Sequence, residues 1–155
     1  MRRRQFLIGA GSTACVLVGA GAWVSSRDIE KARAPWRLGD RTFDDPRLHA
    51  LAHAILAPNP HNRQPWLVEV RDDDRIILWP DLNRLLPETD PPNRQIVIGF
   101  GAFLELLRQA ATMIGYDIET VPFPEGSAAT RLDGRMIADI RLIPGGTTPD
   151  ALASS

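Results

Sequence analysis

One apolar stripe constrains the fold more than any other feature of this sequence. Apolar side chains recur in alternating steps of four and three residues, at Ile96, Phe100, Phe103, Leu107, Ala110 and Ile114. This spacing predicts one long amphipathic helix that buries the stripe, and Gly115 is expected to end it. Because the polar residues lie off the stripe, we expect the helix to pack in the core or against another subunit.

The other patterns predict a shorter helix and four strands. Asp45-Pro46 provides an N-cap and a first-turn proline for a helix that Pro58 would end. The β-prone runs lie at residues 67–70, 75–79, 116–121 and 136–143. An acidic turn at residues 72–74 joins the first two runs as a hairpin, and an Asp-Gly turn precedes the last. These elements predict a mainly antiparallel sheet.

The composition excludes several classes of protein and site. The chain has 155 residues with 18 basic and 19 acidic side chains, and this near-neutral balance argues against a nucleic-acid partner. The single cysteine, Cys15, excludes a disulfide framework within the chain and a metal cluster built from cysteines. His49 and His53 have the i, i+4 spacing of a metal pair, but no third ligand is evident in the sequence. We therefore expect two surface histidines and no metal site.

The first 26 residues predict an export signal. Arg3-Arg4-Gln5-Phe6-Leu7 fits the twin-arginine pattern of two arginines, any residue, then Phe-Leu. The charge-free apolar segment at residues 7–23 is short for a membrane span, and Ala20-Gly21-Ala22 offers a cleavage site of small residues. We expect the twin-arginine export machinery as a partner and the periplasm or cell envelope as the location. An uncleaved membrane anchor and an ordinary apolar helix are the alternatives.

The rest of the chain divides into three parts. Residues 27–44 mix charge, proline and glycine without periodicity, and are expected to form a linker or arm. Residues 45–143 carry the predicted helices and strands of the folded domain. Residues 144–155 are rich in small and turn-forming residues, so we expect an unstructured tail and a truncation point there.

The stretch from Ala57 to Trp66 is the strongest candidate for a functional site. It leaves a helix, passes through a compact polar loop and feeds directly into a strand. Asn62 and Gln64 each offer a donor and an acceptor, which suits the alternating carbonyl and N–H edge of a flavin ring. The spacing alone is also that of a capped turn with a packing tryptophan.

The same stretch resembles a known family. Ala57-Pro58 followed by His61-Asn62-Arg63-Gln64-Pro65-Trp66 resembles the Ala-Pro-Ser-x-x-Asn-x-Gln-Pro-Trp signature of the FMN-dependent nitroreductase family. The stretch from Asp90-Pro91 through Arg94-Gln95 to Gly115 resembles in particular the exported, two-halved, Acg-like nitroreductase-like proteins. The resemblance covers residues 45–143, which would be one nitroreductase-like half domain and an N-terminal portion of the two-halved proteins.

This resemblance implies a nitroreductase-like α+β fold with a mainly antiparallel sheet flanked by helices, incomplete because it is one half. It also implies a flavin oxidoreductase. FMN would lie between two halves or subunits and carry electrons from NAD(P)H to a nitro compound, a quinone or a similar acceptor. Asn62 and Gln64 would contact the flavin ring or its ribityl chain, and His61 and Arg63 would flank the pocket. A homodimer or a C-terminal half that this chain lacks would complete the enzyme.

Two alternatives remain open. The family's Arg-Arg-Ser/Thr phosphate clamp has no counterpart between Ser25 and His49, which favours a truncated, cofactor-free remnant. An exported protein would meet little NAD(P)H, which favours a non-enzymatic protein of the envelope that binds or sequesters flavin. The sequence names no catalytic residue, because no serine or cysteine stands in a nucleophile-elbow pattern.

Overall fold

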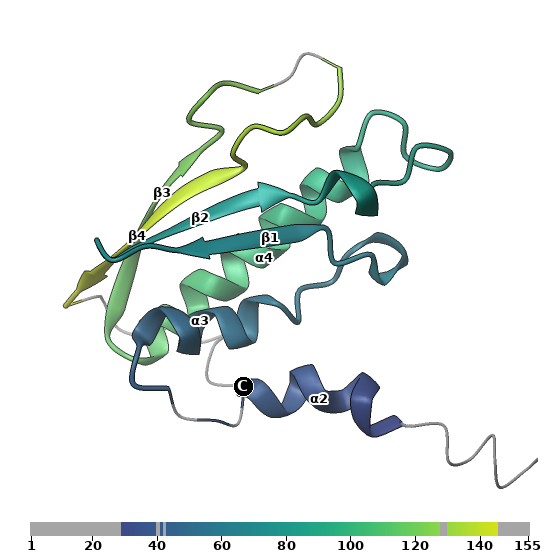
Figure 1. The fold of residues 1–155 in the computed structure, drawn as a ribbon. Coiled ribbons are helices and arrows are strands. Elements are labelled where there is room, and N and C mark those ends of the chain that lie inside the picture. The colour runs from purple at the N-terminus through teal and green to yellow at the C-terminus, as the bar shows by residue number, and fades with distance from the viewer. Residues whose placement is uncertain (1–28, 40, 42, 128–129, 146–155) are drawn as a thin grey trace, which may run out of the picture. The chain divides into compact units, whose positions relative to one another are not determined.

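The computed structural model describes residues 29–39, 41, 43–127 and 130–145 (Figure 1). The twin-arginine signal predicted for residues 1–26 lies outside these residues, as does the predicted tail from residue 146 onward. Contacts divide the chain after Ala34 into two units. In the first unit only residues 29–34 are described, and they are helical. The second unit, 35–155, contains all the elements that follow helix α2.

Helix α2 (Ile29–Gly39) corrects the linker or arm expected over residues 27–44. The sequence Glu30-Lys31-Ala32-Arg33-Ala34 consists of residues with high or moderate helix propensity. Pro35 lies inside the helix and interrupts the apolar periodicity from which a helix is predicted. Local helix propensity therefore prevails here over the helix-breaking proline.

The two predicted helices of the folded domain are confirmed. In α3 (Pro46–Ala54) the Asp45 carboxylate accepts a hydrogen bond from the Arg47 backbone N–H at 2.8 Å, as an N-cap does. In α4 (Arg94–Met113) the apolar stripe is buried from Ile96 to Ala110. The last stripe residue, Ile114, is 36% exposed, because it follows the helix as its C-cap.

The four strands form one antiparallel sheet in the order β1-β2-β4-β3. Their bounds are β1 (Trp66–Val70), β2 (Arg75–Pro80), β3 (Tyr116–Pro122) and β4 (Ala138–Pro144). β1 and β2 are the predicted hairpin. β4 pairs with both β2 and β3, so the last strand in the sequence is a central strand of the sheet. The predicted α+β fold with a mainly antiparallel sheet is confirmed.

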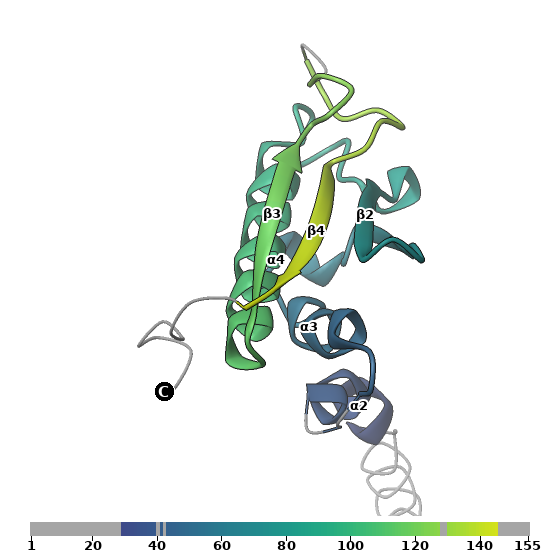
Figure 2. The ribbon, with the colours of Figure 1, turned by 90° about the vertical axis from the view of Figure 1, so that its left-hand side faces the viewer.

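Helices α3 and α4 pack on one face of this sheet. Figure 2 shows α4 running alongside β3 and β4. The core cluster joins Leu51 of α3, Ile76 and Leu78 of β2, Ile140 of β4 and Phe100 of α4, among others. By length and composition alone α4 could cross a membrane, but a buried core helix has the same length and composition, and 44% of its most apolar stretch is buried in the structure. Its stripe lies at the centre of the core.

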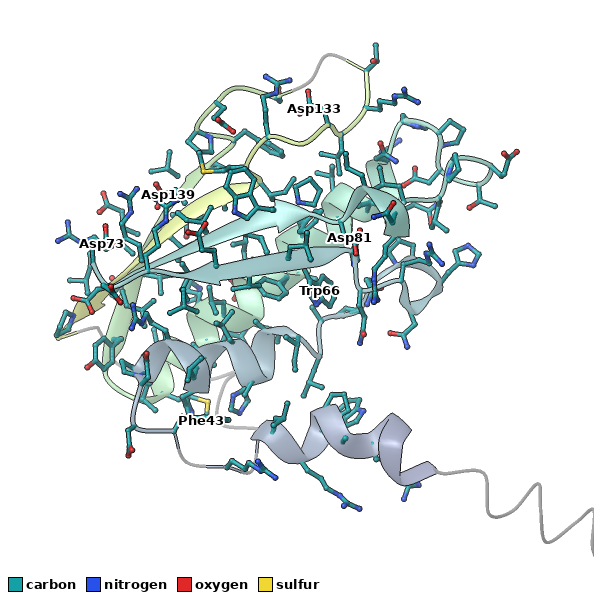
Figure 3. All side chains as sticks on the ribbon, viewed as in Figure 1. Phe43, Trp66, Asp73, Asp81, Asp133 and Asp139 are labelled. Carbon is teal, nitrogen blue, oxygen red and sulfur yellow. The ribbon has the colours of Figure 1, made fainter. Side chains whose placement is uncertain are left out.

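The other face of the sheet carries charged side chains. Arg75 of β2 forms an ion pair with Asp139 of β4, with Nε 2.9 Å from Oδ1. Asp139 and Arg141 share this face, as the alternation along the strand predicts, while Ile140 points into the core. Figure 3 shows Asp73 and Asp139 on this charged side of the sheet.

Candidate functional site

The motif residues form a loop that connects α3 to β1 and includes the short 3-10 helix η1 (Pro60–Asn62). Ala57 at its start is 3% exposed and Pro65 at its end is fully buried. The next residue, Trp66, packs its ring against Phe103 of α4 with a centroid separation of 5.1 Å, and Figure 3 labels it at the start of β1. Both ends of the loop are therefore anchored in the core.

The loop backbone is left-handed at three residues that are not glycine. The φ angle is 51° at His61, 49° at Asn62 and 47° at Gln64. Side chains disfavour this region, and asparagine tolerates it best of the three. A backbone of this kind persists only where the surrounding contacts hold it.

Asn59 supplies three of those contacts. Its Nδ2 donates to the Ala57 carbonyl at 3.0 Å, and its Oδ1 accepts from the Gln64 backbone N–H at 2.7 Å. Its backbone carbonyl accepts from the Asn62 N–H at 3.2 Å. Asn59 is not among the residues predicted for the site, although asparagine in a proline-flanked turn commonly bonds to nearby backbone.

Arg63 and Arg84 tie the loop to a second 3-10 helix, η2 (Leu82–Arg84). The Arg63 guanidinium donates to the carbonyls of Arg84 and Asn83, each at 3.0 Å. The Arg84 guanidinium donates in return to the Arg63 carbonyl at 3.1 Å. Arg63 therefore braces the loop, and its predicted place beside a flavin stays a prediction.

The other three predicted site residues keep their side chains available. His61 and Asn62 are exposed, and Gln64 is half-buried. In the part of the chain that the structure describes, none of these three side chains hydrogen-bonds to another residue. The loop thus brings one imidazole and two amides together within four residues of a braced backbone. Their contact with a flavin is a prediction that the fold leaves open.

The N-terminus of α4, which could otherwise attract an anion, is already capped. Asp90 is 4% exposed, and its Oδ2 accepts from the N–H groups of Gln95 at 2.9 Å and Ile96 at 3.1 Å. The buried Asn93 accepts through Oδ1 from the Leu132 N–H at 3.0 Å, which ties the segment before β4 to this end of the helix. Because a carboxylate occupies the helix N-terminus, a phosphate would have to bind elsewhere.

The two histidines of α3 form a pair. The ring centroids of His49 and His53 are 5.0 Å apart, and His53 Nδ1 lies 3.1 Å from the His49 carbonyl. Burial and then the neighbouring His53 lower the pKa of His49. Among the described residues no three potential ligands of the His, Cys, Asp and Glu types come together. The geometry offers two ligands where a structural metal site needs about four.

Two clefts lie outside the loop. One of 490 Å³ lies near η2 and is lined by apolar and polar residues, among them Leu82, Leu132 and Arg131. The other, of 410 Å³, lies on the charged face of the sheet beside Arg75 and Arg141. Neither is lined by His61, Asn62 or Gln64. The exposure of His61 and Asn62 shows that this part of the loop lies on the surface of the described chain.

Comparison with solved structures identifies the class of fold. A structure provisionally described as an NADH oxidase from Clostridium acetobutylicum matches with a TM-score of 0.52 and 13% identity, over 73% of this chain and 81% of that one. A structure provisionally described as a nitroreductase in complex with FMN, from Desulfovibrio desulfuricans, has a TM-score of 0.46 and 18% identity, over 74% and 84% of the two chains. The first match carries the argument: the chain has the α+β fold of this nitroreductase-like class.

Curated relatives lead to the same group of proteins. The chain is 35% identical over 75 residues to a Mycobacterium tuberculosis protein provisionally named NAD(P)H nitroreductase Acg. The matched stretch is 48% of this chain and 22% of that protein. It is 32% identical over 87 residues to an uncharacterized protein of the same organism, or 54% of this chain and 25% of the relative. No protein-family model matches. The chain spans about a quarter of the length of these relatives and is similar to nitroreductase-like proteins over that part.

Proposed function

We propose that this chain is part of an FMN-dependent, nitroreductase-like oxidoreductase, and that the loop at residues 59–64 binds the flavin. One observation carries the proposal: the loop holds Asn62 and Gln64 on a braced left-handed backbone, with amide groups that no residue of the described chain uses. Amide groups that have no partner within the described chain, carried on an ordered backbone, are suited to a ligand with a fixed pattern of donors and acceptors. The similarity to the Acg protein and the fold of the class support the same assignment.

The residues of the loop fit the ring of a flavin better than its phosphate. Two amides can pair with the carbonyl and N–H groups of an isoalloxazine edge. The N-terminus of α4 is occupied by Asp90 and offers no place for a phosphate. We infer that this chain contributes the ring-binding side of the site and that the phosphate is bound by groups outside the described residues.

The role of the chain's own residues is to bind and orient. Asn62 and Gln64 would hold the ring edge through their amides, while His61 and Arg63 flank it and Arg63 keeps the loop attached to η2. Bound FMN would supply hydride chemistry, taking electrons from NAD(P)H and giving them to a nitro compound, a quinone or a similar acceptor. No acid or base among these residues is required for that step.

The exposed position of the loop indicates that another half completes the site. A flavin ring has two faces, and His61, Asn62 and Gln64 lie on the surface of this chain and outside its two described clefts. A second copy in a homodimer, or a further half domain of the same polypeptide, would cover the ring and bind the phosphate. We place this complete protein in the periplasm or envelope, exported by the twin-arginine machinery through residues 1–26.

A flavin-holding protein without turnover is the second candidate. It is favoured by the export expected from residues 1–26, because an exported protein would meet little NAD(P)H. Reduction of bound flavin by NAD(P)H in a stopped-flow spectrophotometer separates the two candidates. Reduction on mixing supports the oxidoreductase, and unchanged absorption supports the flavin-holding protein.

The loop assignment is tested by flavin binding. Asn62→Gly deletes the amide while easing the left-handed backbone, so it isolates the side chain from the conformation. We expect an increase of about tenfold in the Kd for FMN, measured by quenching of flavin fluorescence, since about one hydrogen bond is lost. Asn83→Ala removes an exposed amide from neighbouring η2 and should leave the Kd unchanged. Equal affinities for Asn62→Gly and the unmodified chain would return Asn62 to the role of a turn residue.

A further inference from the structure

Asn59 is the first residue of the loop at residues 59–64, and it is not one of the four predicted site residues. Three successive features of the loop meet at Asn59: its start at Ala57, its left-handed end at Gln64 and its contact with α4. Asn59 itself has an extended backbone, with φ −150° and ψ 153°. Its side chain bonds only to the backbone of Ala57 and Gln64, so any effect of Asn59 on a ligand would act through those residues.

The side chain of Asn59 spans the loop. Nδ2 donates to the Ala57 carbonyl at 3.0 Å and Oδ1 accepts from the Gln64 N–H at 2.7 Å, so one amide links residues seven positions apart. The bond to Gln64 fixes a peptide whose residue has a φ of 47°. Glutamine has no intrinsic preference for left-handed φ values. Without the hydrogen bond to its N–H, Gln64 could relax to a negative φ.

Gly99 of α4 sets how closely the loop can approach the helix. A Cβ atom on Gly99 would lie 3.3 Å from the Cβ of Asn59 and 3.6 Å from its Cα and from Pro60 Cδ. That spacing is tighter than an ordinary contact, and Gly99 lies on the buried side of α4 between Ile96 and Phe103, which anchor the helix in the core. A methyl group at Gly99 would therefore displace Asn59 and, through it, Gln64.

We propose that Asn59 is a positioning residue that, together with the space left by Gly99, presets the conformation of the loop at residues 59–64 before any ligand arrives. This inference rests on the proposed function only for the identity of the ligand. The side chains of Asn62 and Gln64 would then bind with little loss of conformational entropy, because the backbone that carries them is already ordered. A loop that ordered only around its ligand would lack such a brace.

Hydrogen exchange of the Gln64 amide tests the brace without flavin. In the full chain we expect this N–H to be protected, and Asn59→Ala to speed its exchange by about tenfold, as the loss of one hydrogen bond allows. Asn59→Asp keeps an Oδ acceptor for Gln64 and should restore most of the protection. An unprotected Gln64 amide in the unmodified chain, or equal exchange in the chain with Asn59→Ala, would overturn the proposal.

Two glycines of α4 provide a matched pair for the contact. Gly99→Ala and Gly101→Ala both gain helix propensity, but a Cβ at Gly101 has nothing within 4 Å. We expect Gly99→Ala alone to speed exchange at Gln64 and to raise the Kd for FMN, while Gly101→Ala changes neither. Faster exchange with unchanged FMN affinity would show that the brace does not position the ligand groups, and would refute that part of the inference. A chain that binds no FMN would refute the proposed function and leave the exchange test of the brace valid.

Discussion

At the scale of single residues, sequence patterns located the loop but not the contacts that shape it. Asn62 and Gln64 could be singled out because their side chains match a known signature. The role of Asn59 depends on a hydrogen bond across five residues, from Gln64 N–H, and on a left-handed backbone that no composition rule predicts. Arg63 likewise bonds to carbonyls about 20 residues further along the chain. Such pairings exist only after the elements have packed.

Glu105 on the outer side of α4 gives a pH-dependent prediction. Hydrogen bonds from the side chains of Arg108 and then Gln109 lower its pKa from 4.5 to about 2. Because the folded pKa lies below the unfolded one, the stabilisation is complete above pH 4.5 and is lost as the pH falls toward 2. The effect on stability is small, since the carboxylate is half exposed.

The measurement is an NMR titration of the Glu105 carboxyl carbon. We expect a midpoint near 2 in the unmodified chain and a shift toward the ordinary value after Arg108→Gln, which removes the guanidinium. A midpoint close to 4.5 in the unmodified chain would mean that these hydrogen bonds do not persist in solution.

At the scale of elements, periodicity carried most of the prediction. The stripe of α4, the capped start of α3 and the first hairpin were all readable from the sequence, because burial imposes a repeat of about 3.6 residues on helices and 2 on strands. Helix α2 was missed because Pro35 lies inside it and Gly39 ends it, and both residue types usually mark a break in a helix. The strand order could not be predicted. The alternation of apolar and polar residues along a strand indicates which face of that strand is buried, but not which strand pairs with it.

Phe103 should be the most costly α4 side chain to truncate. It is fully buried and packs against Trp66 at the end of the functional loop. We expect Phe103→Ala to lower the free energy of unfolding by about 3–5 kcal/mol in urea denaturation. Ile98 on the same helix is 64% exposed, and Ile98→Ala should change stability by less than about 0.5 kcal/mol. Similar losses for both variants would contradict the packing described for α4.

At the scale of the whole molecule, the chain is a folded domain that, in our proposal, supplies one side of a flavin site. It spans about a quarter of the relatives it matches, and its loop side chains lie on its surface. The antiparallel sheet could be predicted from the strand patterns, and the α+β class from the family resemblance of the motif. The share of the site that this chain supplies could not, because it depends on which groups of a partner half meet the loop.

Export is the prediction that belongs to the entire polypeptide. Arg3 and Arg4 precede Phe6-Leu7 in the twin-arginine pattern, and this route depends on the guanidinium groups of the pair. We expect the unmodified chain in the periplasmic or membrane fraction of fractionated cells, and the chain with Arg3→Lys and Arg4→Lys in the cytoplasm. Arg2→Lys, just outside the pattern, serves as the control. Equal distribution of the three chains would exclude this route.

The place of β4 in the sheet has a consequence for synthesis. Because β4 lies between β2 and β3, a nascent polypeptide that has emerged only as far as residue 137 exposes two strand edges that have no neighbour. Completion of the sheet must wait until residue 144 has left the ribosome, so the sheet cannot close while β4 is still in the exit tunnel. We expect the open edges to be available to chaperones and proteases during that interval, and fast docking of β4 to shorten it.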